Sequence, residues 1–227
     1  MSIGSISQRV YGQTRYFFKY IAVAKSDNKK YAGDATVSQG KILRRLWGLH
    51  TASRAITSAR RRHKRGRTPP EYGEWLYSRG ARAAGNCQEM CCVALYFFTR
   101  ARLGTTQPFP VNYIGVRDLG DHAFLIAGYL PSAVVNMPYF ETSRFSVLML
   151  CNAVPAYVES YVVDPWAGIF CHTRMYPFEF LRKMRSWGAQ GKEVWWGRAW
   201  RQPGEASYVD SFVNSRFYVR DVLEEFG

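Results

Sequence analysis

Two consecutive segments near the middle of the chain are Gly85-Asn86-Cys87-Gln88-Glu89-Met90-Cys91-Cys92 and Val93-Ala94-Leu95-Tyr96-Phe97-Phe98. Together they predict a helix over residues 87–102, because small residues give way to an apolar run that has neither proline nor glycine before Gly104. Apolar side chains occupy nearly every face of this helix, so we expect other elements to cover it on all sides.

Cys87 is the expected first residue of this helix. Unpaired backbone N–H groups and the positive end of the helix dipole favour an anion at that position, which lowers the pKa of a thiol and makes it more reactive. The dipole contributes about 0.3–1 kcal/mol, which is less than one pKa unit. A reactive Cys87 therefore also needs a base from elsewhere in the chain.

Downstream of the helix the sequence pattern changes to β. Short apolar and β-branched runs alternate with Gly, Pro, Asn and Asp, which is typical of strands and turns. Strands are predicted over residues 111–116, 123–129, 145–150 and 157–163, with further candidates at 169–173 and 207–219. Residues 176–187 are typical of a helix that Pro177 opens and Gly188 closes. One buried helix ahead of several antiparallel strands predicts an α+β domain.

The excess positive charge lies in the first 70 residues. Of the net charge of +14, residues 1–70 carry 16 Lys and Arg against two acidic residues, whereas residues 71–227 carry 15 of each sign. Residues 1–40 have few apolar runs, and we expect them to be mobile or docked as loose strands. The break at Thr68-Pro69-Pro70 predicts two units, a basic N-terminal arm over 1–70 and the main domain over 71–227.

Within the arm, residues 41–65 predict a basic amphipathic helix that ends in a cationic run. Residues 41–67 suit an anionic partner, either a membrane surface or nucleic acid. The plainer alternative is a solvated helix that packs its apolar side on the main domain.

Cysteine usage and hydropathy indicate the compartment. The five cysteines are an odd number and include the neighbours Cys91 and Cys92, which favours free thiols in a reducing environment. No apolar run is long enough to predict a transmembrane helix. Lys19 interrupts the best signal-peptide candidate, so no cleavable signal is expected.

His122 and Asp164 are the residues best placed to complete a site with Cys87. His122 precedes an apolar strand, where an imidazole serves either as a catalytic base or as a core histidine. Asp164 ends a β-branched run, where it either accepts the Nδ1–H of His122 or forms an Asp-Pro turn. Thiol, imidazole and carboxylate at such element ends are the components of a thiol hydrolase.

The segments Gly85-Asn86-Cys87-Gln88-Glu89, Asp121-His122-Ala123-Phe124 and Val163-Asp164-Pro165-Trp166 resemble the Cys-His-Asp signatures of papain-like and transglutaminase-like bacterial effectors and toxins, above all those that deamidate glutamine in host proteins. The resemblance covers about residues 85–166. It implies a papain-like fold, in which the helix carrying Cys87 packs on an antiparallel sheet carrying His122 and Asp164. It also implies that Cys87 is the nucleophile, His122 the base and Asp164 the orienting acid.

Residues beside this triad have expected roles too. The oxyanion hole would use the backbone N–H of Cys87, with Asn86 and Gln88 as candidate second donors. Trp166 is expected either to wall the site or to be ordinary core, and Glu89 to stabilise the first turn of the helix. Because 41 residues separate His122 from Asp164, we expect an extra strand or loop between them that includes residues 145–150.

The sequence therefore predicts a bacterial effector or toxin, secreted into a host cell and acting in its reducing cytosol. Its expected activity is hydrolysis of protein amides without a cofactor, most specifically deamidation of glutamine in a host protein. No metal is expected, since the Cys and His residues lack the paired spacing of a zinc site. A papain-like cysteine protease is the first alternative. The second is a basic module that binds nucleic acid or a membrane surface without catalysis.

Overall fold

The computed structural model describes residues 1–22, 26, 28–32, 35, 37–63, 66–102, 108–116, 122–135, 146–196 and 199–221. Its centre is an antiparallel sheet of five strands in the order β5-β4-β3-β2-β8. The strands are β2 (Val111–Val116), β3 (His122–Gly128), β4 (Ser160–Asp164), β5 (Ile169–His172) and β8 (Phe217–Asp221).

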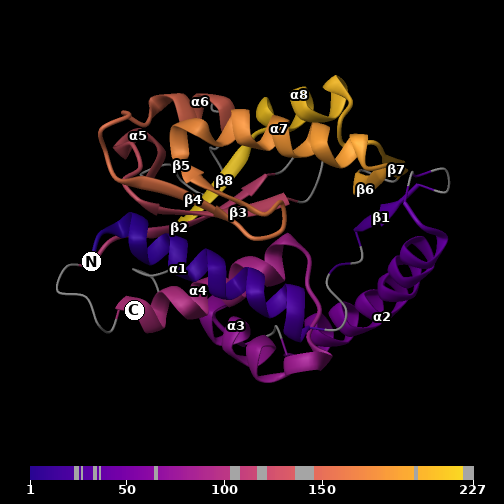
Figure 1. The fold of residues 1–227 in the computed structure, drawn as a ribbon. Helices are drawn as coiled ribbons and strands as arrows, with labels where there is room; N and C mark the ends of the chain where they lie inside the picture. The colour runs from indigo at the N-terminus through magenta and orange to yellow at the C-terminus, as the bar shows by residue number, and fades with distance from the viewer. Residues whose placement is uncertain are drawn as a thin grey trace.

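Helices cover both faces of this sheet (Figure 1). On one side, α1 (Ile3–Tyr16) and α4 (Cys87–Arg102) pack against the strands, and α3 (Pro69–Ser78) packs on the outside of α4. On the other side lie α5 (Ser132–Val135), α6 (Val147–Ala153), α7 (Tyr176–Ala189) and α8 (Ala206–Val213). The structure is thus α+β, and α4 is buried between layers as its all-round apolar pattern predicts.

A second, smaller sheet pairs a strand from the N-terminal part of the chain with two strands from its C-terminal part. Its order is β1-β6-β7, from β1 (Lys29–Tyr31), β6 (Lys192–Trp196) and β7 (Ala199–Arg201). The long helix α2 (Gln39–His63) lies beside β1. Short helical turns complete the described elements: η1 (Phe17–Ile21), η2 (Gly80–Arg82) and η4 (Thr173–Met175).

The expectation that residues 1–40 are mobile or docked as loose strands is wrong for α1. Ser2 caps this helix by accepting the Ser5 N–H, and Ile6 and Val10 are buried in the same hydrophobic core as α4. The two apolar residues are one helical turn apart, so they form a narrow stripe that the surrounding polar residues conceal in the sequence. The division at residue 70 stays a prediction, but the two segments share one core.

Two strand predictions are also wrong. Residues 147–150 belong to α6, because Ser146 caps it by accepting the Met149 N–H at 3.2 Å; residue 145 lies outside the described residues. Residues 207–213 belong to α8, whose buried Tyr208, Val209 and Phe212 follow helical spacing, and the last strand starts at Phe217. β3 and β4 pair directly, so the elements described between His122 and Asp164 include helices rather than an extra strand.

The remaining element predictions agree with the structure to within a few residues at each end, including the helices α2, α4 and α7. Across the described ranges, no helix combines the length and the hydropathy needed to span a membrane.

Candidate active site at the end of the central sheet

His122 and Asp164 form a buried hydrogen-bonded pair. Nε2 of His122 lies 2.9 Å from Oδ2 of Asp164, and the two side chains are 5% and 0% exposed. The strand register places Leu125 opposite Val163, which sets Asp164 opposite Phe124 and His122 at the next position on the same face. Such diagonal neighbours lie within reach of long side chains.

Asp164 bonds Nε2 of His122 and not Nδ1, which corrects the prediction from sequence. The diagonal placement explains the difference, because Nε2 is the ring nitrogen farther from the backbone and spans the longer gap. An ionised carboxylate can only accept, so Nε2 donates, and in the neutral form of the imidazole the lone pair is on Nδ1. Nδ1 is therefore the nitrogen able to act as a base.

Asp164 accepts hydrogen bonds from two further donors. The Tyr176 hydroxyl donates to Oδ2 at 2.9 Å, and the Ala167 backbone N–H donates to Oδ1 at 2.9 Å. Burial raises the pKa of Asp164, but the charge of His122 and these hydrogen bonds outweigh burial and hold that pKa below its ordinary value. Asp164 is thus an anion at neutral pH. Burial, followed by the charge of Asp164, raises the pKa of Tyr176 well above its usual range.

Aromatic rings enclose the imidazole. The ring centroids of Phe124, Trp166, Phe180 and Phe212 lie 5.0 to 6.2 Å from that of His122. Trp166 is the nearest of these and is itself buried. These rings restrict rotation of the imidazole and keep water from its Asp164 side.

Cys87 is the first residue of α4, as predicted, and is 3% exposed. The turn that it starts is fixed by Glu89, whose carboxylate accepts the backbone N–H of Asn86 at 3.1 Å. The same buried carboxylate takes a bidentate ion pair from Arg60 of α2, at 2.7 and 3.0 Å. Glu89 therefore stabilises the helix start, in agreement with the prediction, and it also ties α2 to the helix of Cys87.

A chain of polar side chains connects the start of α4 with the turn after Asp164. Ser26 bonds the side-chain oxygens of Asn86, at 2.9 Å, and of Asn28. Trp166 donates its ring N–H to the same Asn28 oxygen at 2.8 Å. Asn86 precedes Cys87, and Trp166 packs on His122. Cys87 thus begins α4 at the end of the sheet where His122 begins β3.

Asn86 and Gln88 flank Cys87, and both are partly exposed. The Asn86 side chain is oriented by its hydrogen bond from Ser26. Their roles as oxyanion donors stay predictions, as does that of the Cys87 backbone N–H, which lies in the first turn of α4.

Burial makes three other thiols less acidic than a free cysteine. Burial raises the pKa of Cys91 and Cys151 far above that of a free thiol, and raises that of Cys171 to about 12. All five thiols are unbridged. Among the described residues, no three His, Cys, Asp or Glu side chains are grouped to hold a metal ion.

The sequence located the His122–Asp164 pair and the start of α4 but missed Tyr176, Ser26 and Asn28. Nothing in the sequence pattern marks these three. Ser26 and Asn28 bond residues 60 and 138 positions away, and the Tyr176 bond crosses from α7 to the end of β4. Comparisons with protein-family models, curated proteins and solved structures found no match for the chain.

Proposed function

We propose that the protein is a thiol hydrolase of protein amides, with Cys87 as nucleophile, His122 as base and Asp164 as the residue that orients the imidazole. The observation that carries the proposal is the buried bond from His122 Nε2 to Asp164. That bond leaves the basic Nδ1 at the end of the sheet where α4 starts with a thiol.

The reaction follows from these positions. Nδ1 of His122 takes the proton of the Cys87 thiol, and the thiolate attacks the carbonyl carbon of a carboxamide. Backbone N–H groups in the first turn of α4 would stabilise the oxyanion. The imidazolium returns its proton to the leaving nitrogen, so that ammonia departs and a thioester remains. Water, deprotonated by Nδ1, then attacks the thioester, releasing a carboxylic acid and regenerating the Cys87 thiol.

Within this chemistry we propose deamidation of glutamine in a host protein by a bacterial effector or toxin. The support for this finer statement is the sequence resemblance around Cys87, His122 and Asp164. A cysteine protease shares every step except the leaving group, which would be the amine of a cleaved backbone amide.

Product analysis separates these reactions. A mixture of host cytosolic proteins incubated with the wild-type protein is expected to gain glutamate in place of glutamine at a few positions and to release ammonia, with intact chains. The same mixture incubated with Cys87→Ser is the control, compared by peptide mass spectrometry. New chain termini would indicate a protease, and incorporated amine would indicate a transglutaminase. Identical peptide maps for the wild type and Cys87→Ser would contradict the hydrolase proposal.

A second candidate function rests on the surface of α2. Ile42, Ala52 and Ile56 are buried, yet Leu43 and Trp47 of the same basic helix are 57% and 80% exposed. Exposed apolar side chains among Lys and Arg favour a lipid surface over nucleic acid. We propose that α2 lies on anionic membranes; residues 64 and 65 of the predicted 41–67 range lie outside the described residues.

Trp47→Ser is expected to reduce sedimentation with phosphatidylserine vesicles several-fold, because the residue that enters the interface is lost. Tyr157→Ser is the matched control, since Tyr157 is an aromatic residue 92% exposed elsewhere on the surface. Equal sedimentation of the wild type and both variants would contradict the proposal.

A further inference from the structure

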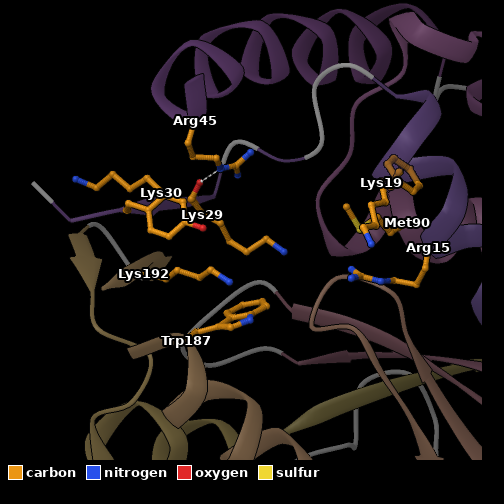
Figure 2. Close-up of a pocket in the computed structure, with 10 residues that line it drawn as sticks. Arg15, Lys19, Lys29, Lys30, Arg45, Met90, Trp187 and Lys192 are labelled. Carbon is orange, nitrogen blue, oxygen red and sulfur yellow. Dashed lines mark hydrogen bonds between the residues drawn. The ribbon is translucent and has the colours of Figure 1, made fainter. Parts of the chain in front are cut away.

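A cationic pocket lies beside the candidate active site, with a cavity of about 430 Å³. Six of the described residues that line it are basic and none is acidic. The six are Arg15, Lys19, Lys29, Lys30, Arg45 and Lys192. Figure 2 shows that Lys29 and Lys192 reach into the opening from one side, while Arg15 and Lys19 approach from the opposite side.

This gathering of charge is produced by folding rather than by a local run of lysines. The six residues come from α1, η1, β1, α2 and β6. Like charges repel one another more strongly where water is partly excluded, so this group of cations destabilises the fold unless an anion offsets it. Burial, followed by the charge of Arg45, lowers the pKa of Lys29 well below its usual value. Burial, followed by the charge of Lys183, lowers the pKa of Lys192 to about 8.

Neutral groups hold two of these cations in place. The Lys29 ammonium donates to the Trp166 carbonyl at 2.8 Å, and the Arg15 guanidinium donates to the Pro165 carbonyl at 3.0 Å. Carbonyls position a cation without cancelling its charge. Lys30, by contrast, forms an ion pair with Glu193 at 2.9 Å.

The shape and lining of the pocket select among anionic ligands. Ammonium groups already lie over the aromatic rings: Lys29 and Lys192 are 4.6 and 5.2 Å from the ring centroid of Trp187, and Lys192 is 6.0 Å from that of Tyr31. A nucleobase would have to displace these cations to stack there. Several convergent ammonium groups in a small cavity instead match several negative charges on a compact molecule.

We propose that this pocket binds a small polyphosphate anion, contacted by Lys19, Lys29 and Lys192 and supported by Arg15 and Arg45. The ligand would sit behind the turn that follows Asp164, because Lys29 and Arg15 hold the carbonyls of that turn. It would therefore tighten the segment that positions Asp164 and Trp166. Binding itself does not depend on the proposed hydrolase, and Cys87→Ser is expected to bind the anion like the wild type.

The probe is sodium tripolyphosphate, with inorganic phosphate at matched ionic strength as the weaker anion, measured by titration calorimetry. We expect saturable binding of tripolyphosphate and at least tenfold weaker binding by Lys19→Gln/Lys192→Gln. Arg44→Gln/Arg54→Gln removes the same charge from exposed positions of α2 and should bind like the wild type. Because the bound anion favours the charged form of Lys192, binding near pH 8 should take up protons, which calorimetry in buffers of different ionisation enthalpy detects.

Lys19→Gln alone changes an exposed side chain and should therefore fold. If the double variant fails to fold, the affinity of this single variant for tripolyphosphate, which should be weaker than that of the wild type, takes its place in the test. Phosphatidylcholine vesicles with a tenth of phosphatidylinositol bisphosphate distinguish the source of the phosphates. If these vesicles displace tripolyphosphate, the pocket takes a lipid headgroup; if they do not, it takes a soluble anion. The absence of saturable tripolyphosphate binding, or an equal loss in the Arg44/Arg54 control, would overturn the proposal.

Discussion

The Cys87→Ser variant is expected to lose about 10³-fold or more of its amide hydrolysis rate, because removal of a catalytic nucleophile commonly costs this much or more in kcat. A serine hydroxyl is far less acidic than a thiol, and the Nδ1 of His122 cannot deprotonate it as readily. The melting temperature should change little, since the two side chains are nearly the same size. Initial rates of ammonia release, with thermal melts of the same preparations, give both quantities.

Cys171→Ser is the matched control for this loss. Cys171 lies on β5, and burial raises its pKa to about 12, so a thiol is again exchanged for a hydroxyl without touching the proposed nucleophile. It should retain wild-type activity. If Cys87→Ser keeps its activity, or if both variants lose it equally, Cys87 is not the nucleophile.

The Asp164→Asn variant is expected to lose about 10²- to 10⁴-fold in kcat/KM, as when the acid of a comparable triad is replaced by its amide. The Asp164 carboxylate accepts from His122, Tyr176 and Ala167, and all three partners are donors. An amide has one accepting oxygen and must turn its NH₂ group toward one of them. If the NH₂ meets Nε2, the imidazole adopts the opposite tautomer, in which Nδ1 is protonated and cannot accept the thiol proton.

The same substitution should change the pH dependence of stability. The folded-state pKa of Asp164 lies below its ordinary value, so its ionisation stabilises the fold above the unfolded pKa of about 3.9. That stability is lost as the pH falls through the folded pKa. The wild type should be more stable than Asp164→Asn near neutrality, and their unfolding free energies should converge in acid. Urea unfolding over a pH series measures the two curves.

Tyr176→Phe is the graded control, because it removes one of the hydrogen bonds that lower the pKa of Asp164. Its acid-dependent loss of stability should be smaller than in the wild type and complete at a higher pH, because its folded-state pKa lies closer to the unfolded one. Its effect on kcat/KM should be smaller than that of Asp164→Asn. If the stability of Asp164→Asn falls in acid as steeply as that of the wild type, the carboxylate is not the anion described here.

Local sequence patterns were sufficient to predict elements whose structure depends on neighbouring residues. The apolar run after Cys87 fixed α4, and His122 and Asp164 at strand ends were correctly placed in one another's reach. The choice of Nε2 depends on the diagonal register between β3 and β4, which no local pattern reports. The strand predicted at residues 145–150 was wrong because a short apolar run suits both helix and strand, and Ser146 as a cap decides for the helix.

The N-terminal region was the hardest part to predict, for a different physical reason. The apolar stripe of α1, formed by Ile6 and Val10, is narrow and hard to recognise in the sequence. The contacts of Ser26 and Asn28 with Asn86 and Trp166 form only once the whole chain has folded. Residues that look dispensable by composition can therefore complete a site formed far downstream.

Ser26 and Asn28 link Asn86 to Trp166, and this link makes the proposed activity sensitive to cleavage of the backbone upstream of α4. Because Ser26 and Asn28 lie upstream of α4, a cut in the backbone between α1 and β1 is expected to weaken this link and to lower the proposed activity, even with Cys87, His122 and Asp164 chemically intact. A protease cleavage sequence introduced there would therefore give an experimental means of switching the proposed activity off.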